Sequence, residues 1–185
     1  MKDIMETIAN EMAEVIQRTD SAEAKELAEE LSHAKRIFIA GAGRSGLVGR
    51  VFAMRLMHSG YPVFVVGETI TPSIEEKDLL LVISGSGSTG TLLSHATKAK
   101  EIQARIALVT TTKESEIGQI SNCTVQIPAA TKKRLAHEPS TIQPLGSQFD
   151  QAAHLLLDAV IIYLLNHVDK EKGQEKLQKK HANLE

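Results

Sequence analysis

The sequence predicts an α/β fold, a three-layer α-β-α sandwich around a five-stranded parallel sheet with helices at its N-terminal side. Two observations predict it. Five short apolar segments alternate with segments of helical periodicity, which is typical of a parallel sheet covered on both faces. Two Gly-rich turns directly follow two of these apolar segments, at the strand ends where ligands bind in such folds.

The first two helices come before any strand. Apolar residues at helical spacing indicate a helix over 3–18. Asp20 and Ser21 can cap a second helix, which faces inward through Leu27 and Leu31.

The remaining elements alternate along the chain. The predicted strands are 36–40, 62–66, 78–84, 104–110 and 123–127. Helices are predicted at 46–59, where Gly60 ends the helix, at 88–102, and briefly at 114–119. Residues 128–148 form a Pro-containing loop, and loops of that length are often functional. The last helix, 149–168, is apolar most of the way round, so we expect it to be buried on more than one side, with another subunit as one cover.

Composition limits the class of protein. The chain has 185 residues, a net charge of −2 and 3% aromatic residues, which argues against nucleic acid or an acidic membrane as a partner. We expect one domain over 1–168 and a charged, solvated tail over 169–185. The N-terminus resembles neither a signal peptide nor a membrane span, and the single Cys123 in an apolar segment indicates a buried residue in a reducing cytoplasm.

The turn "GAGRSG" (41–46) contains Gly43, Arg44 and Ser45 and matches the dinucleotide-binding pattern G-x-G-x-x-G. Glu68, at the end of the second strand, could then meet a ribose. A lone match of this kind is weak, however, and it leaves the second Gly-rich turn without a role.

That second turn, "ISGSGSTGT", fits a phosphate site better. Its hydroxyl groups and the N–H groups of the following helix can bind an anion, and its glycines let the chain come close to it. Read together, the two turns form a cradle for one phosphate. The proposed substrate- or phosphate-binding residues are Ser84, Gly85, Ser86, Ser88 and Thr89 in the second turn and Gly43, Arg44 and Ser45 in the first. The simpler alternative is that Ser and Gly only turn the chain and cap the helix.

These two turns resemble the phosphate-sugar loops of the sugar isomerase (SIS) domain family, which has a flavodoxin-like fold. Together with "MHSGYPVFVVGET" and "PLGSQFDQ", they are similar to the 6-phospho-3-hexuloisomerases within that family. The resemblance implies a cytoplasmic enzyme of the ribulose monophosphate pathway, which takes part in formaldehyde fixation and detoxification. It implies isomerisation of D-arabino-hex-3-ulose 6-phosphate to fructose 6-phosphate, no cofactor, and a dimeric or tetrameric assembly.

Isomerisation between two carbons of a ketose requires a base, an acid at the oxygens and an anchor on the phosphate. His58 is a candidate base by the resemblance, although on the residues alone a core or interface histidine is the stronger interpretation. Glu68 is the second candidate, with an exposed loop acid as its alternative. Asp150 can complement the dipole of the last helix, or it can support residues that contact the substrate without contacting the substrate itself. Its short side chain argues against direct proton transfer.

Other features leave alternatives open. His137 and Glu138, beside Lys132, Lys133 and Arg134, lie in a loop long enough to fold over a sugar phosphate. No spacing of His, Cys or Asp predicts a metal site. Competing hypotheses are another SIS isomerase such as one for arabinose 5-phosphate, a non-catalytic sugar-phosphate sensor, and a nicotinamide oxidoreductase.

Overall fold

A computed structural model describes residues 1–168, so the predicted tail 169–185 lies outside the described residues. Its centre is a five-stranded parallel sheet with the strand order β2-β1-β3-β4-β5. In register, Ile37 of β1 pairs with Val63 of β2 and Leu79 of β3. The strands are β1 (Ile37–Gly41), β2 (Val63–Val65), β3 (Leu79–Ile83), β4 (Arg105–Thr110) and β5 (Cys123–Gln126). The parallel α/β fold predicted from the sequence is confirmed.

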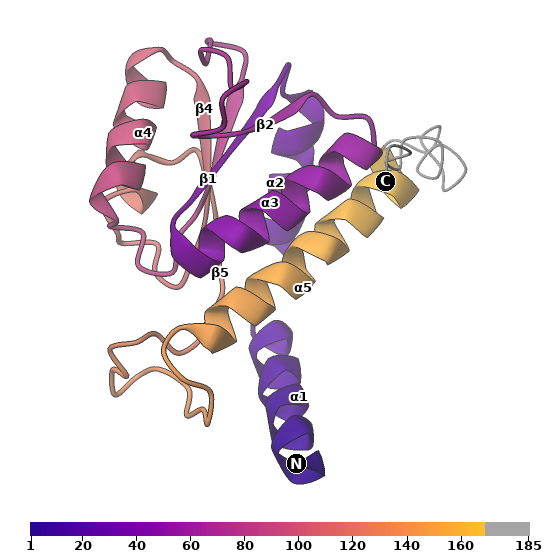
Figure 1. Cartoon of the computed structure of the whole chain (residues 1–185), viewed down its shortest axis with the longest axis vertical. Helices are drawn as coiled ribbons and strands as arrows, with labels where there is room; N and C mark the ends of the chain where they lie inside the picture. The colour runs from indigo at the N-terminus through magenta and orange to yellow at the C-terminus, as the bar shows by residue number, and fades with distance from the viewer. Residues whose placement is uncertain (169–185) are drawn as a thin grey trace.

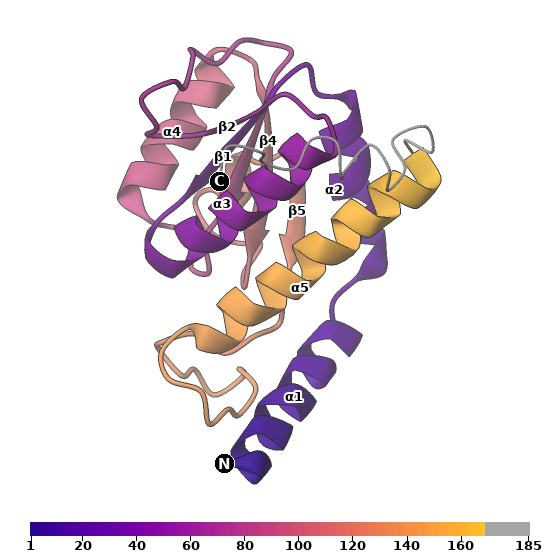
Figure 2. The ribbon, with the colours of Figure 1, turned by 45° about the vertical axis from the view of Figure 1, so that its right-hand side comes forward.

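Helices cover both faces of this sheet (Figures 1 and 2). The helices are α1 (Lys2–Gln17), α2 (Ser21–His33), α3 (Gly43–His58), α4 (Gly90–Glu101) and α5 (Ser147–Tyr163). Alternate strand residues face opposite ways, so Ile37 and Ile39 join the core under α2, α3 and α5. Phe38 and Ala40 join the core under α4. These are the three layers expected from the alternating pattern.

Several element ends differ from the prediction. Helix α3 begins at Gly43 rather than 46, because Gly43 adopts φ +57° and turns the chain from β1 directly into the helix. The short helix expected near 114–119 is reduced to a 3₁₀ turn, η1 (Gly118–Ile120). The predicted caps are present: Asp20 accepts a hydrogen bond from the Ala22 amide at 2.8 Å, and Gly60 ends α3 with φ +86°.

The last helix continues from α5 into a π-helical turn, η2 (Leu164–Val168). By length and composition alone, Ser147–Val168 could cross a membrane. In the fold, however, this helix contacts α2 and α3 and buries Leu157 and Val160 against them in the main core. Those contacts are typical of the core helix of a folded domain. Its opposite side leaves Leu155 and Ile162 exposed.

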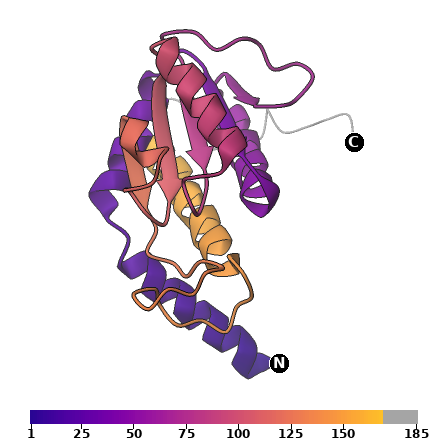
Figure 3. The same ribbon diagram turned by 90° about the vertical axis from the view of Figure 1, so that its left-hand side faces the viewer.

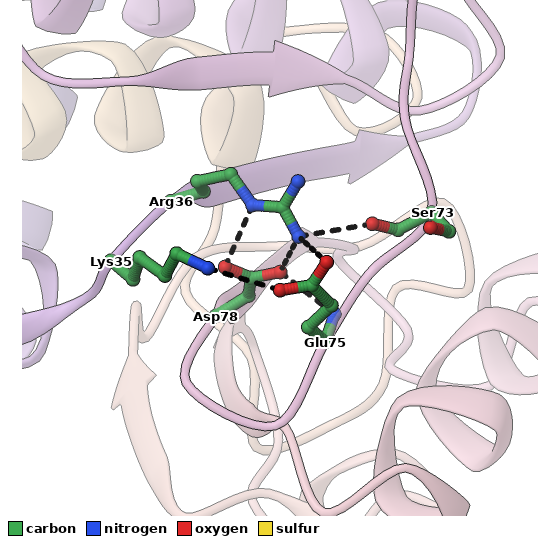
Figure 4. Close-up of polar contacts among 5 residues, drawn as sticks. All are labelled: Lys35, Arg36, Ser73, Glu75 and Asp78. Carbon is green, nitrogen blue, oxygen red and sulfur yellow. Dashed lines mark hydrogen bonds and ion pairs between the residues drawn. The ribbon is translucent and has the colours of Figure 1, made fainter.

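The amino-terminal edge of the sheet is fixed by a buried ion pair (Figure 4). Asp78 is 1% exposed and accepts hydrogen bonds from Arg36 Nε at 3.0 Å, Arg36 Nη2 at 2.6 Å and the Glu75 amide at 2.7 Å. Arg36 also donates to the Ser73 carbonyl. A buried carboxylate is tolerated when it is paired and hydrogen-bonded in this way, so this cluster joins the starts of β1 and β3. In open α/β sheets, ligands bind at the opposite, carboxyl edge.

Helix α1 extends beyond the sheet at the carboxyl edge (Figure 3). The long loop 128–148 lies beside it, and Glu11 of α1 joins the two through hydrogen bonds to Thr141, Ile142 and Gln143. Only the carboxyl-terminal half of α1 is anchored in the core, through Met12 and Val15, whereas Ile4 and Met5 are exposed.

Candidate active site

A cavity of about 850 Å³ opens at the carboxyl edge of the sheet, where α3 and α5 begin and the long loop folds over. Its position is the one expected for ligand binding in open α/β sheets. Four groups of residues line it: the end of α1 (Arg18), the turn after β1 (Ala42, Arg44, Ser45), the ends of β3, β4 and β5 (Gly85, Ser86, Thr111, Thr112, Glu114, Gln126), and the segment from the loop into α5 (Pro128, Ala129, Thr131, Lys132, Lys133, Leu135, His137, Glu138, Pro139, Leu145, Gly146, Phe149, Asp150).

The turn after β3 is held rigidly at the back of this cavity. The Gly85 carbonyl accepts hydrogen bonds from the Thr111 amide at 3.1 Å, from Thr111 Oγ1 at 2.7 Å and from Thr110 Oγ1 at 3.2 Å. The Gly87 amide donates to Ser84 Oγ at 3.2 Å. The backbone of this turn is therefore fixed before any ligand arrives, which lowers the entropy cost of binding.

Gly87 is the glycine that this turn requires. It adopts φ +59°, and a Cβ atom placed on it would lie 2.1 Å from Ser115 Oγ. No other residue fits without moving the turn. The glycine requirement thus has a direct structural cause, in addition to any close approach of a ligand.

The hydroxyls of Ser86 and Thr89 lie close to the start of α4. Ser86 is exposed and lines the cavity. Thr89 is the N-cap residue of α4, yet its side chain makes no capping hydrogen bond. Thr89 thus stands at the N-terminal end of α4, where the free amides and the positive dipole of a helix favour an anion.

The turn after β1 packs tightly against the start of α3. A Cβ atom on Gly46 would lie 2.7 Å from the Gly41 carbonyl oxygen, so both glycines are explained by the close approach of strand and helix. The match to a dinucleotide pattern therefore has a packing cause. Arg44 and Ser45, between these glycines, are left to line the cavity.

Asp150 joins this turn to the start of α5. Its Oδ1 accepts a hydrogen bond from Ser45 Oγ at 2.9 Å, and its Oδ2 lies 3.0 Å from Arg44 Nε. Burial raises the pKa of Asp150, and the hydrogen bond from Ser45 and the charge of Arg44 offset part of this effect. The cavity thus contains a desolvated carboxylate whose orientation is fixed by two partners.

The charge of the lining favours an anionic ligand. Four Lys or Arg side chains line the cavity, against three carboxylates, although the whole chain is acidic. The cations are Arg18, Arg44, Lys132 and Lys133. The Glu138 carboxylate faces its own loop, where it accepts hydrogen bonds from the Thr131 amide and hydroxyl.

The predicted site residues divide into three groups. Arg44, Ser45, Gly85, Ser86 and Asp150 line the cavity together, with His137 and Glu138 of the long loop. Gly43, Ser84, Ser88 and Thr89 belong to the same two turns but do not line the cavity. His58 and Glu68 lie elsewhere.

His58 lies at the far end of α3. The helix starts at the cavity with Gly43 and runs for 16 residues away from it, beside α5 (Figure 1). At 1.5 Å per residue, His58 is about 22 Å from the turn after β1. It is 9% exposed there. His58 therefore does not line the cavity of its own chain.

Glu68 follows β2, the edge strand, and forms an ion pair with Arg50 of α3. It does not line the cavity. Its carboxylate is partly exposed, with 43% of the side chain accessible. Glu68 is therefore paired with Arg50 and lies outside the cavity of its own chain.

Several residues that line the cavity carry no sequence motif, Thr111, Gln126 and Arg18 among them. Thr111 follows β4 directly and Gln126 is the last residue of β5, so the rule that predicts the two Gly-rich turns also applies to them. Arg18 ends a helix that precedes the sheet, and no local pattern places it near the cavity.

Cys123 is a buried core residue with a free thiol. Burial raises the pKa of the Cys123 thiol to about 12, and nearby Glu26 and Glu30 add to the effect, so the thiol is an inert core group. Across residues 1–168, no group of three or more His, Cys, Asp or Glu side chains is arranged to hold a metal ion.

Comparison with known proteins decides the family. The profile of the SIS domain matches residues 30–155. The chain belongs to the SIS domain family. It is 40% identical over 178 residues to a Bacillus subtilis protein named 3-hexulose-6-phosphate isomerase, which covers 96% of this chain and 95% of that relative. A Mycobacterium gastri protein of the same name is 42% identical over 178 residues, and the match covers 96% of this chain and 88% of that protein.

A solved structure agrees with this assignment. A Methanococcus jannaschii protein, for which a 3-hexulose-6-phosphate isomerase function was inferred from its crystal structure, superposes with a TM-score of 0.84 at 32% identity over 100% of both chains. The resemblance to the SIS domain family is thereby confirmed. In this SIS domain both turns border one cavity.

Proposed function

We propose that this SIS domain protein is a sugar-phosphate isomerase that converts D-arabino-hex-3-ulose 6-phosphate to fructose 6-phosphate through an enediol. One observation carries the proposal. The cationic cavity combines a rigid hydroxyl-lined turn at a helix N-terminus with an oriented carboxylate, Asp150. Names of relatives at 40% and 42% identity support the same substrate.

The phosphate is anchored by the turn after β3. Ser86, Thr89 and the first amides of α4 donate to its oxygens, and Ser84 and Ser88 hold the turn in shape. Ser84 Oγ already accepts from the Gly87 amide, and Ser88 bonds to Ser86. Arg44 and Lys132 add positive charge. Because the phosphate is remote from the reacting carbons, its binding energy aligns them.

The proton transfer requires a base beside C2 and C3 of the sugar. The base removes the proton from C2 of the 3-ketose, the C3 carbonyl becomes part of a 2,3-enediol, and a proton returns to C3 as the C2 carbonyl forms. We assign this base to Asp150, whose raised pKa makes it a better proton acceptor. This revises the supporting role expected from the sequence.

His58 enters the proposal through a second subunit. An exposed apolar stripe runs along α3 toward it through Leu47, Val51 and Met54, whose exposed fractions are 62%, 36% and 46%. A stripe of this kind marks an interaction surface. We propose that a second copy of the chain packs on α3 and α5, and that its His58 assists proton transfer at this cavity. Glu68 remains the alternative catalytic group.

Ligand-dependent thermal stability tests the substrate class. Fructose 6-phosphate at about 100 times its Kd is expected to raise Tm by about 5 °C or more, because a ligand that binds only the folded chain stabilises it. Unphosphorylated fructose serves as the control and is expected to shift Tm little. A shift with NAD and none with sugar phosphates would favour the oxidoreductase hypothesis and contradict the proposal. We propose no cofactor and a cytoplasmic location for the enzyme.

A further inference from the structure

Helix α1 and the long loop are joined at Glu11, which takes no part in the proposed proton transfer or phosphate anchor. Glu11 Oε2 accepts hydrogen bonds from Thr141 Oγ1 at 2.5 Å and Gln143 Nε2 at 2.9 Å, and its Oε1 accepts from the Ile142 amide at 2.8 Å. Three donors from one short loop segment thus converge on one carboxylate of a helix about 130 positions away in the sequence.

The charge of Glu11 is part of this contact. Burial by itself would raise the pKa of Glu11, but the hydrogen bonds from Thr141, Gln143 and Ile142 and the charge of Arg134 outweigh burial and lower it. The carboxylate is therefore ionised at neutral pH. Hydrogen bonds to a charged acceptor are about twice as strong as those between neutral groups.

The contact continues into the wall of the cavity. Arg134 donates to the Gln143 carbonyl, and Arg134 follows Lys132 and Lys133, which line the cavity. A second internal clamp holds the same turn, because Glu138 accepts hydrogen bonds from Thr131 and Leu135. Glu11 therefore fixes one side of the turn that carries the two lysines.

The loop needs such a restraint because its backbone is strained. Arg134 and Leu145 adopt φ +51° and +53°, a left-handed conformation that costs a non-Gly residue about 1–2 kcal/mol each. The amide oxygen of Gln143, in the part of the chain that the structure describes, is buried without a hydrogen-bond partner, while its amide nitrogen faces Glu11. Strain and an unpaired polar atom persist only where surrounding contacts impose the conformation.

We propose that Glu11 is a positioning residue for substrate binding: through Thr141, Ile142 and Gln143 it holds the 131–145 wall of the cavity closed around the sugar phosphate. The N-terminal helix is then a part of the binding site in two ways, through this carboxylate and through Arg18 at its end. The inference rests on the proposed function for the identity of the ligand, and on geometry alone for the order of the loop.

The test combines two variants and a matched control. Glu11→Gln keeps the shape of the side chain but removes the charge, and Thr141→Val removes one donor. Glu14→Gln makes the same change three residues along α1 at an exposed position. Limited trypsin digestion reports loop order, because Lys132, Lys133 and Arg134 are cleavage sites in the exposed loop, and mass spectrometry identifies cleavage there.

Glu11→Gln is expected to speed cleavage at 132–134 and to weaken fructose 6-phosphate binding, each by about tenfold, with kcat changed much less. Thr141→Val is expected to act in the same direction, and the double variant to fall short of the sum, because both changes break one contact. Glu14→Gln should match the wild type. Thr141→Val alone carries the test if Glu11→Gln does not fold.

Two outcomes would overturn the inference. One is unchanged cleavage at 132–134 in both variants. The other is faster cleavage with unchanged fructose 6-phosphate binding, which leaves Glu11 a purely structural role. Wild-type protein that binds fructose 6-phosphate without turnover would contradict the proposed reaction and leave the Glu11 test intact, since its readouts are cleavage and binding.

Discussion

Replacing Ser86 and Thr89 together by Ala is expected to raise KM for the sugar phosphate by at least about a hundredfold, because each lost hydrogen bond to a charged oxygen is worth about 1.5–3 kcal/mol. Ser86 lines the cavity, and the Thr89 hydroxyl is not used in capping α4. A decrease in kcat is expected to accompany the change, since the phosphate also aligns the reacting carbons. Steady-state kinetics and fructose 6-phosphate binding measure both effects.

A matched control separates this effect from a general disturbance of α4. Ser94→Ala with Thr97→Ala removes the same two hydroxyl types from exposed positions on the same helix. That variant should retain wild-type kinetics. If the Ser86 and Thr89 variant binds fructose 6-phosphate as well as the wild type does, the phosphate lies elsewhere in the cavity and the assignment is wrong.

Asp150→Asn and His58→Gln are each expected to lower kcat by about 10²- to 10⁴-fold, the range for a positioned acid–base group. Asp150→Asn keeps the shape that Ser45 and Arg44 contact but removes the proton acceptor. His58→Gln should leave fructose 6-phosphate binding intact, because the proposed phosphate anchor, the turn after β3, is built from other residues. His95→Gln, at an exposed position on α4, is the control for loss of a histidine.

Mixing the two inactive variants tests whether one site is built from two subunits. In a mixed oligomer, a His58→Gln subunit contributes an intact Asp150 and an Asp150→Asn subunit contributes an intact His58. Random mixing at equal amounts is then expected to restore about a quarter of the wild-type activity. If mixing restores nothing, the shared site is contradicted. If His58→Gln alone retains full activity, Glu68→Gln becomes the informative variant.

The pH dependence of kcat/KM should carry the signature of Asp150. Burial holds its pKa above the ordinary value for an aspartate, so the basic form is lost at a higher pH than for an exposed carboxylate. The acidic limb of the wild-type profile is therefore expected to report this raised pKa and to be absent from the residual activity of Asp150→Asn.

The fold and the meeting of the two Gly-rich turns at one cavity were predictable because their signals are local. Apolar runs define β1, β3 and β4, and the turns after β1 and β3 must meet at the carboxyl edge of a parallel sheet. The position of His58 was also implicit, since a helix that starts at the cavity must carry its last residue away from it. Periodicity placed His58 on an apolar stripe, but distance along the helix decides what it can reach.

The long-range contacts could not be predicted from the sequence. Ser45 meets Asp150 across 105 positions, and Glu11 meets Thr141 across 130. Neither pair has a spacing or motif, because both depend on how α5 and the loop settle against the rest of the fold. From the sequence, Asp150 was therefore interpreted as complementing the dipole of the last helix. Its burial beside Arg44 changed that interpretation.

Exchange of the carbon-bound hydrogens of fructose 6-phosphate with D₂O, followed by NMR, tests the central claim most directly. A 2,3-enediol requires that the hydrogen on C3 be removed in the reverse reaction, so the account predicts that deuterium enters C3 and that Asp150→Asn slows this entry by about 10²-fold or more. Entry at C1 in place of C3 would identify an aldose–ketose isomerase. No entry at either carbon, together with no formation of the 3-ketose from bound fructose 6-phosphate, would identify a sensor and contradict the account.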